Sequence, residues 1–342
     1  MIDSLLSLEK VSVEFRAQTS LFRSVPIYAL NDISLNLTPG ETMAIVGESG
    51  SGKTTLGRVC LRLLEPTHGK ITFAGENVSK MSSKDLKKMR RRAQAIFQDP
   101  FSSIDPFMTV RQIVEEPLII HGYKNQPNTI TNRTEIVEWA LEEVKLGPTK
   151  TMLDKYPHTL SGGQRQRVAI ARAIVLNPEL IIADEPVSMI DASSRLELLY
   201  LLSEIQARHN TTFLYITHDI ATTRHFSNRI AIMYMGHIVE LGSTSHVIDN
   251  PLHPYTQSLL EAVPEPNPMN RFKMRGSSGG ELPSIVNPPT GCHFHPRCDY
   301  FKPGQCDQIA PLQVVVKPGH LTMCHLWEKP TTNPRLPRQN DT

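Results

Sequence analysis

One eight-residue segment constrains the fold of this chain more than any other: Gly47-Glu48-Ser49-Gly50-Ser51-Gly52-Lys53-Thr54. It matches the pattern G-x-x-x-x-G-K-[ST] at every fixed position. The apolar run 43–46 before it is typical of a buried strand, and the run 56–64 after it is typical of a helix. This order of strand, loop and helix is the context that the motif needs. The segment therefore predicts a phosphate-binding loop, and a chance Gly/Ser linker is the weaker interpretation.

Each part of the predicted loop has a chemical purpose. The glycines let successive backbone N–H groups turn toward phosphate oxygens, and the N-terminus of the following helix adds partial positive charge. Lys53 supplies an ammonium group for the β- and γ-phosphates, and the hydroxyl of Thr54 is a hard oxygen ligand for Mg²⁺. We expect the loop residues that bind the nucleotide to be Gly47, Ser49, Gly50, Ser51, Gly52, Lys53, Thr54 and Thr55.

Length and charge narrow the class of protein. A chain of 342 residues has room for one or two domains. A net charge of +2 argues against nucleic acid as the main partner. No apolar run approaches the ~20 residues that span a bilayer, and residues 1–4 lack the pattern of a secretory signal. We expect a cytosolic protein that serves any membrane process by docking.

The pattern of apolar residues indicates an α/β fold. Residues 5–15 and 27–37 alternate apolar and polar positions, which predicts antiparallel strands joined by a variable loop over 16–25. A basic helix is expected over 83–92, and residues 109–176 are mostly helical by period. Further short apolar strands are expected at 70–73, 93–97, 180–183, 213–216 and 230–233. Strands that alternate with helices predict a mostly parallel sheet covered on both faces.

The composition changes near residue 250, where Pro and Gly become frequent and helical periodicity weakens. We therefore predict a main domain over 1–250 and a C-terminal extension over 251–330. The tail 331–342 is expected to be disordered.

Two acids end one of the apolar strands. Asp184 directly follows the run 180–183, where it is placed to join the shell of a magnesium ion. Glu185 comes next and is placed to polarise an attacking water as a general base. Two acids that end a strand by chance are the alternative, which the phosphate loop upstream disfavours.

Three other polar features accompany the loop. The segment 161–164, Ser-Gly-Gly-Gln, opens a helix and leaves N–H groups at its positive end, which predicts a second anion site unless the segment is only a helix cap. Gln98 and His218 each follow an apolar strand. In open α/β sheets, ligands collect at such carboxyl ends of strands.

Over residues 5–240 this set of motifs resembles the nucleotide-binding subunits of ABC transporters. The resemblance implies a phosphate-loop NTPase (RecA-like) core with an antiparallel β subdomain, and a helical signature subdomain over about 99–160. It also implies ATP with Mg²⁺, the ion being held by Thr54, Gln98 and Asp184. Its further site residues are the Q-loop Gln98, the signature Ser161, Gly162, Gly163 and Gln164, the Walker B Asp184, the catalytic Glu185, the D-loop Asp191 and the switch His218.

The same resemblance implies an aromatic ring stacked on adenine and a head-to-tail pair of such domains. Phe15 is the expected ring, with Phe22 and Tyr28 as alternatives. In the pair, the segment 161–164 of one domain closes on the ATP held by the phosphate loop of the other.

A closer resemblance is to the ATPases of oligopeptide/dipeptide importers. It is carried by the segments 98–106, 233–236 and 250–256, the last reading Asn-Pro-Leu-His-Pro-Tyr-Thr. Residues 61–67 and 261–266 look more like the second of the two ATPase subunits of those systems. The resemblance implies that ATP hydrolysis drives the import of peptides or oligosaccharides. It also implies a heterodimer with a related ATPase, two membrane permease subunits, an extracellular binding protein, and a location at the cytoplasmic face of the membrane.

Four of the five cysteines gather near the C-terminus: Cys292, Cys298, Cys306 and Cys324. Because reducing cytosol disfavours disulfides, such a cluster indicates metal or iron–sulfur ligation. Importer ATPases of the type named above resemble this tail, and the resemblance implies a [4Fe–4S] cluster that orders the extension. The alternatives are a zinc ion, with His293, His295 or His325 among its ligands, and unligated core cysteines. Cys60 stands apart and is expected to be a core residue.

A non-transport ABC ATPase of DNA repair or translation is the alternative function. Repair ATPases of this lineage insert long coiled coils before the signature. Here about sixty residues separate Gln98 from Ser161, without a sustained heptad pattern, which favours transport.

Overall fold

The computed structural model describes residues 4–20, 23–99, 103–123, 132–263 and 283–328. Its strands are β1 (Leu6–Ser20), β2 (Arg23–Leu37), β3 (Thr42–Val46), β4 (His68–Phe73), β5 (Glu76–Asn77), β6 (Ala93–Ile96), β7 (Leu180–Asp184), β8 (Thr212–Thr217), β9 (Arg229–Tyr234), β10 (His237–Ser243), β11 (Gln313–Lys317) and β12 (His320–Met323). Its α-helices are α1 (Lys53–Cys60), α2 (Ser83–Arg92), α4 (Val110–His121), α5 (Arg133–Glu143), α6 (Lys150–Leu153), α7 (Gly162–Ile174), α8 (Ala192–His209), α9 (Ile220–Phe226), α10 (Thr244–Asp249) and α11 (Pro254–Glu261). Short 3-10 helices are η1 (Val78–Lys80), η2 (Pro157–Thr159) and η4 (His295–Arg297).

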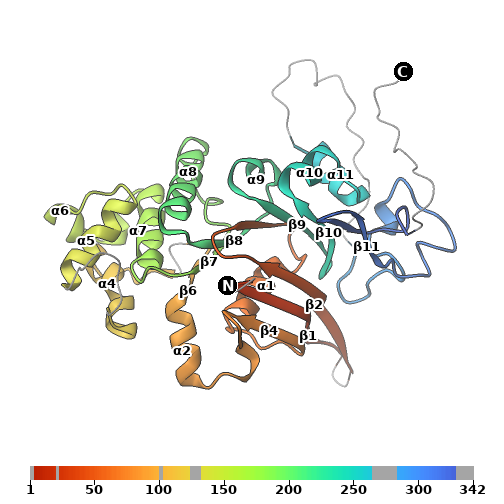
Figure 1. The fold of residues 1–342 in the computed structure, drawn as a ribbon, viewed down its shortest axis with the longest axis horizontal. Coiled ribbons are helices and arrows are strands. Elements are labelled where there is room, and N and C mark those ends of the chain that lie inside the picture. Colours follow the sequence, from red (N-terminus) through yellow and green to blue (C-terminus); the bar gives the residue numbers. More distant parts are fainter. Residues whose placement is uncertain (1–3, 21–22, 100–102, 124–131, 264–282, 329–342) are drawn as a thin grey trace, which may run out of the picture.

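The strands form two sheets (Figure 1). The larger sheet has the order β11-β12-β10-β9-β3-β8-β7-β6, and the smaller one has the order β2-β1-β4-β5. From β9 to β6 the larger sheet is parallel, whereas β10, β12 and β11 add to it antiparallel. The smaller sheet is antiparallel throughout. The predicted fold class, a parallel phosphate-loop core with an antiparallel β subdomain, is confirmed.

The central strands are buried on both faces, as their continuous apolar runs predict. In β3, Met43 and Ile45 pack into the core shared with the smaller sheet and α1, while Ala44 and Val46 pack into a second core on the opposite face. All four side chains are fully buried. Because successive side chains of a strand point to opposite faces, one short strand anchors two cores.

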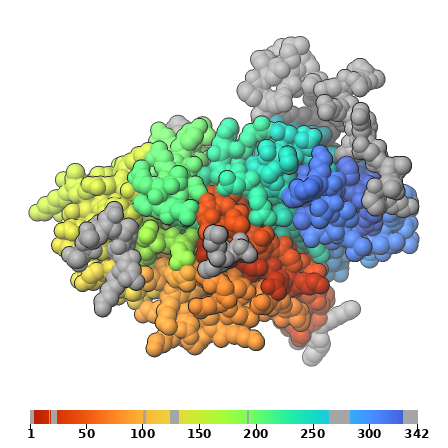
Figure 2. Space-filling view, in the orientation of Figure 1, coloured from red at the N-terminus to blue at the C-terminus, as the bar shows by residue number. Residues whose placement is uncertain are grey.

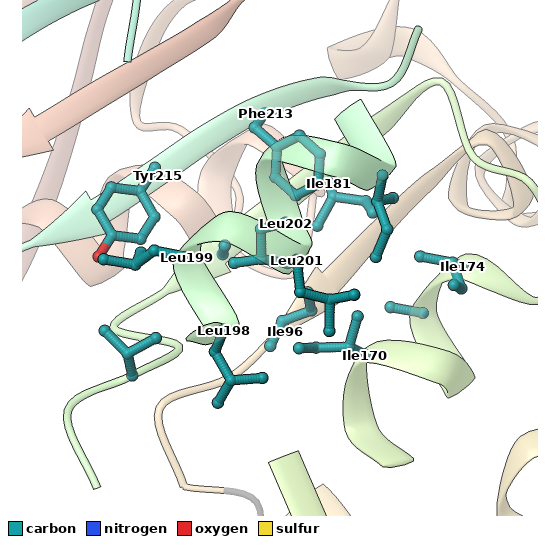
Figure 3. Packing of buried hydrophobic residues seen from close by; sticks show 14 of the residues in the cluster. Ile96, Ile170, Ile174, Ile181, Leu198, Leu199, Leu201, Leu202, Phe213 and Tyr215 are labelled. Carbon is teal, nitrogen blue, oxygen red and sulfur yellow. The ribbon is translucent and has the colours of Figure 1, made fainter. Parts of the chain in front are cut away.

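The second core lies between the larger sheet and the helices α7 and α8 (Figure 3). There Phe213 and Tyr215 of β8 face Leu202 of α8, and Ile170 belongs to the same cluster from α7. The carboxyl ends of β7 and β8 lead from this layer into Glu185 and His218, so the core fixes the positions of these two residues.

The sequence prediction of the N-terminal region was wrong in one part. Residues 16–25 were expected to form a variable loop, but β1 extends to Ser20 and β2 begins at Arg23, with Ala17 paired to Val25 and Gln18 to Ser24. Residues 21–22 lie outside the described ranges. Because no apolar alternation marks this part of the ribbon, the sequence pattern did not reveal it.

The helical region 109–176 contains α4, α5, α6 and α7, which lie together at one end of the molecule (Figure 1). Thr109 and Gln112 form a capping box at the start of α4. Arg172 of α7 donates to Glu116 of α4 at 2.7 Å and to the carbonyl of Ser103 at 3.1 Å. These contacts tie the helical region to the segment that follows Gln98.

A buried carboxylate attaches the C-terminal part of the chain to the larger sheet. Glu240 of β10 is fully buried, and its oxygens accept hydrogen bonds from the backbone of Leu252 and His253, from the Thr256 hydroxyl and from His320 of β12. Four donors satisfy this charge, as a buried carboxylate requires. The blue C-terminal part therefore lies against β10 and α11 rather than apart from them (Figure 2).

Candidate active site

The phosphate loop lies between β3 and α1 and is built around a buried lysine. Lys53 is 6% exposed, and its Nζ donates to the carbonyl oxygens of Gly47 and Glu48, both at 2.8 Å. Burial lowers the pKa of this amine, while the charges of Glu185, Asp184 and Glu48 act in the opposite direction. Within the described ranges no carboxylate forms an ion pair with Lys53. A buried cation with only carbonyl partners is suited to an anionic ligand.

The backbone of the loop has the shape of a phosphate cradle. Gly50 and Gly52 have φ angles of 80° and 103°, in the left-handed region that favours glycine. A Cβ added at Gly52 would lie 2.3 Å from the carbonyl oxygen of Ala29. Helix α1 begins after Gly52 without a side-chain cap, so its first N–H groups have no side-chain acceptor. The buried Ser51 hydroxyl has no hydrogen-bond partner in the described part of the chain. These residues fit the triphosphate of a nucleotide.

Asp184 and Thr54 supply two neighbouring hard oxygens. Asp184 ends β7 and is 9% exposed, and burial raises its pKa, while a hydrogen bond from the Thr54 hydroxyl lowers it. Carboxylate and hydroxyl oxygens are the ligand types that Mg²⁺ takes in phosphate-loop enzymes. Thr54 and Asp184, two of the three predicted ligands, thus lie next to each other. The third, Gln98, donates to Glu185 through its Nε2, a bond that does not use its amide oxygen, and the assignment of the three ligands stays a prediction.

Glu185 lies at the centre of a polar cluster drawn from three strand ends. Its Oε2 accepts a hydrogen bond from Nε2 of Gln98 at 3.0 Å, and its Oε1 lies 3.0 Å from Nδ1 of His218. The three residues follow β6, β7 and β8, which are parallel neighbours in the sheet. Glu185 has a φ of 48°, an uncommon value for a residue with a side chain. The structure thus brings together the three side chains that the sequence predicted as catalytic.

The signature segment begins with an exposed residue, Ser161, and its side-chain hydrogen bonds are made within the segment. The Ser161 Oγ accepts from the Gln164 N–H at 3.2 Å, and the Gln164 Oε1 accepts from the Ser161 N–H at 3.1 Å, which is a capping box at the start of α7. Gly162 and Gly163 are half-buried. No hydrogen bond in the described ranges joins this segment to the phosphate loop.

The other predicted residues lie around this centre. Asp191 caps α8, since its Oδ1 accepts from the Ser194 N–H at 3.0 Å. Ser49 is exposed and Thr55 half-buried. Phe15 and Tyr28 are 44% and 43% exposed and belong to opposite faces of the β1–β2 hairpin, while Phe22 lies outside the described residues. The choice of adenine-stacking ring stays a prediction.

Sequence reasoning missed the contacts that hold Glu48. Its carboxylate forms a two-pronged ion pair with Arg297, and its N–H donates to the hydroxyl of Tyr255. Arg297 and Tyr255 lie more than 200 positions further along the chain. No local pattern signals such a contact, although the motif around Tyr255 was singled out by resemblance.

The predicted metal centre of the extension is not supported. Cys292, Cys298, Cys306 and Cys324 line one cavity, but all are free, and among the residues that the structure describes no three or more Cys, His, Asp or Glu side chains are grouped to hold a metal ion. Burial raises the pKa of Cys298 to about 11 and that of Cys324 to about 12.

The zinc alternative is not supported either, because the predicted histidine ligands make other contacts. Nδ1 of His325 bonds to Glu328 at 2.7 Å, and its Nε2 lies 2.8 Å from the Ile309 carbonyl. Nδ1 of His295 lies 2.9 Å from the Cys292 carbonyl, and the ring of His293 packs against His237. The predictions of an iron–sulfur cluster and of a zinc site are therefore corrected.

Comparison with known proteins agrees with the geometry of the nucleotide site. Residues 30–188 match the family model described as ABC transporter, and residues 239–306 match the model described as oligopeptide/dipeptide transporter, C-terminal region. The chain is 44% identical to the oligopeptide transport ATP-binding protein AppF of Bacillus subtilis, over 95% of this chain and 98% of that protein. It is 43% identical to the putative oligopeptide transport ATP-binding protein YkfD of the same organism, over 91% and 93%.

Solved structures show the same fold over most of the chain. The ATP-binding cassette MJ0796, in a dimeric post-hydrolysis state bound to ADP and Pi, has a TM-score of 0.61 at 30% identity and covers 70% of this chain and 98% of its own. The protein cbiO1 from Clostridium perfringens has a TM-score of 0.60 at 29% identity, over 72% and 92%. No helix in the described ranges is both long and apolar enough to cross a membrane.

Proposed function

Because the chain belongs to the ABC transporter family, as an ATP-hydrolysing subunit of a peptide importer, we propose that hydrolysis occurs at Glu185 in an active site that a second ATP-binding subunit completes. The family membership decides against the alternative of a DNA-repair or translation ATPase. The ATPase subunit of such an importer acts on membrane permeases. The observation that carries the proposal is the Glu185 carboxylate, which Gln98 and His218 hold from both sides at 3.0 Å.

The phosphate loop binds and orients the triphosphate. The N–H groups at the start of α1 face the phosphate oxygens. The Lys53 ammonium group donates two of its three N–H bonds to carbonyl oxygens, and the third serves a phosphate oxygen. Mg²⁺, held by Thr54 and Asp184 when bound, neutralises negative charge on the phosphates. Positioning and charge neutralisation supply most of the catalysis in phosphoryl transfer.

Glu185 takes the proton of the attacking water. A general base must lie within hydrogen-bond reach of that water and must itself be oriented. Gln98 and His218 fix the orientation of the carboxylate, and the side chain of Glu185 retains 15% exposure through which water reaches it. The side chain of His218 is 61% exposed.

The exposed signature segment supports completion by a second subunit. Ser161 exposes its hydroxyl and the N-terminus of α7 to solvent, and in the described residues it forms no hydrogen bond with the phosphate loop of the same chain. MJ0796, which shares this fold, forms a dimer bound to ADP and Pi. We propose that the partner is the related ATPase subunit of the same importer, since residues 61–67 and 261–266 resemble the second subunit of such pairs.

The chain acts at the cytoplasmic face of the membrane as a peripheral subunit that binds two permease subunits. An extracellular binding protein delivers the peptide to these permeases. Phe107, which is 87% exposed in the segment between Gln98 and α4, offers an apolar contact for a permease. Arg172 ties this segment to α7, so a movement of the signature helix is transmitted to it.

The division into domains follows the same proposal. Residues 1–250 form the nucleotide-binding domain, with the helical subdomain at about 99–160, and residues 251–330 form the extension. The family model of the C-terminal region, which matches 239–306, supports a change of character near residue 250. The residues 331–342 lie outside the described ranges.

The test of this function is ATP turnover and peptide uptake by the assembled importer. We expect both to require this chain, and both to be lost together when Glu185 is replaced by Gln. Uptake that continues at the parent rate with the Glu185→Gln chain would contradict the assignment.

A further inference from the structure

Among the described residues, the hydrogen bonds between the C-terminal extension and the phosphate loop converge on Glu48. The Arg297 Nη1 donates to the Glu48 Oε2, and its Nη2 donates to the Glu48 Oε1, both at 2.9 Å. The side chain of Arg297 is 10% exposed and that of Glu48 is 26% exposed. This parallel fork is the strongest geometry of an arginine–carboxylate pair, because it fixes both distance and orientation.

Glu48 is held through its backbone as well. Its N–H donates to the Tyr255 hydroxyl at 2.9 Å, and its carbonyl oxygen accepts from Nζ of Lys53 at 2.8 Å. Tyr255 is fully buried on α11. Glu48 thus links two parts of the molecule. Its carboxylate and N–H bond to the extension, and its carbonyl oxygen bonds to the phosphate-binding Lys53.

Arg297 itself is fixed by an aromatic cluster. Its guanidinium group lies over the ring of Phe294, 5.7 Å from the centroid. Phe294 is buried and contacts Tyr234 of β9 and Tyr255, with ring centroids 5.4 Å apart in both pairs. A side chain whose rotamer is locked by packing positions its partner with little loss of conformational entropy.

We propose that Arg297 is a positioning residue of the phosphate loop: with Tyr255 it holds Glu48 where the Glu48 carbonyl orients the Lys53 ammonium group for ATP. This inference rests on ATP binding at that loop. Arg297 touches neither Lys53 nor a reacting atom, so its effect falls on nucleotide affinity rather than on the hydrolysis step. The extension thereby sets the ATP affinity of the domain to which it is attached.

The test uses the full-length chain with Arg297→Met, Glu48→Gln and both changes together. Binding of a fluorescent ATP analogue gives Kd without hydrolysis, and the assembled importer gives KM and kcat. We expect each single change to raise Kd and KM roughly tenfold, with kcat within about twofold of the parent. Because the two residues act as one pair, the double change should also give roughly tenfold, not the ~100-fold of independent effects.

A matched control exists in Arg92 and Glu179. They form the same kind of fork, at 2.6 and 2.8 Å, and Arg92 lies over the ring of Phe73 at 5.1 Å. This pair lies at the beginning of β6 and β7, at the ends of these strands opposite to Gln98 and Glu185. Arg92→Met should leave Kd and KM within about twofold of the parent, whatever it does to stability.

Three results would overturn the inference. One is a Kd of Glu48→Gln equal to that of the parent, which decides the matter even where Arg297→Met fails to fold. A second is independent effects in the double variant. The third is an equal rise of Kd in Arg92→Met, which would mean general destabilisation. By contrast, a parent chain that binds ATP but hydrolyses none in the importer would overturn the proposed function and leave the inference standing.

Discussion

Two helices of this protein offer their N-termini to phosphate, and they differ in almost every other respect. Helix α1 begins after Gly52 without a side-chain cap, whereas α7 begins with a capping box in which Ser161 and Gln164 satisfy each other. The first therefore keeps its N–H groups available, while the second is stable with nothing bound.

The surroundings of the two helix ends differ as well. The phosphate loop is enclosed by the Ala29 carbonyl from β2, by the Met233 carbonyl from β9 and by Arg297 from the extension. At the start of α7, by contrast, Ser161 is exposed and Gly162, Gly163 and Gln164 are half-buried. A loop fixed from several sides is preorganised for its ligand, and a capped, exposed helix end is suited to reach a ligand on another subunit. In the proposed function, the chain carries two different halves of a site rather than one whole site.

The largest effect is expected from Glu185→Gln, which leaves the phosphate-loop half intact and removes the base. Turnover should fall roughly 1000-fold, within the range of general-base losses, while ATP affinity stays near the parent value. A coupled assay for phosphate release measures the first and titration calorimetry the second. Glu179→Gln, at the other end of β7, is the control. Normal turnover in Glu185→Gln would refute its role as base.

Lys53→Ala breaks the phosphate-loop half itself. Loss of the only ammonium group in that cradle should weaken ATP binding roughly 100-fold, since bonds from a charged donor to phosphate are among the strong ones. Titration calorimetry of the separate chain measures this, with Lys145→Ala as a control in an exposed ion pair. Unchanged ATP affinity would undercut the assignment of the loop.

Ser161→Ala breaks the other half. In the separate chain ATP affinity should be unchanged, whereas turnover in the assembled importer should fall roughly tenfold because the partner's phosphates lose a donor. Ser82→Ala removes an equivalent N-cap from α2 and controls for the stability lost with a cap, about 1 kcal/mol. Weaker ATP binding by the separate Ser161→Ala chain would mean that one chain holds both halves.

The smallest effect is expected at low pH, on the stability of the part of the protein that supports the phosphate loop. Burial lowers the pKa of His253 to about 3, so this neutral ring binds fewer protons in the folded state than in the unfolded one, where its pKa is ~6.5. Stability is therefore full above pH ~6.5 and falls by about 1.4 kcal/mol per pH unit below it.

Urea unfolding at pH 7.5 and at pH 5.5 measures this loss. In the native protein, Nδ1 of His253 accepts from the Tyr255 N–H at the start of α11. His253→Asn keeps a side-chain acceptor at this N-cap but does not titrate, so its stability should depend less on pH. An equal pH dependence in the two proteins would contradict the prediction.

The sequence predicted the parts of the site that follow local patterns. The phosphate loop can be recognised in the sequence because its backbone geometry requires glycine at positions 50 and 52. Glu185, Gln98 and His218 were predicted together because each follows an apolar strand, and parallel strands end at the same edge of a sheet.

What the sequence did not reveal depends on contacts between distant segments. The hairpin beyond residue 15 is held by backbone pairing that needs no side-chain pattern. Arg297 meets Glu48 only because β12 adds to β10 and α11 packs beside the loop, and no spacing encodes that arrangement. The prediction of a metal site from the cysteine cluster was wrong for a related reason. The four cysteines lie close in the sequence, but among the described residues no three or more ligand side chains are grouped to hold a metal ion.

The most direct test of two half-sites is sedimentation velocity on the Glu185→Gln chain mixed with the sister ATPase subunit, with and without Mg·ATP. The account predicts separate subunits without nucleotide and a one-to-one complex when ATP is bound, because each chain's loop holds an ATP that the other's signature covers. A mixture that binds ATP at both loops yet sediments as separate subunits would contradict it.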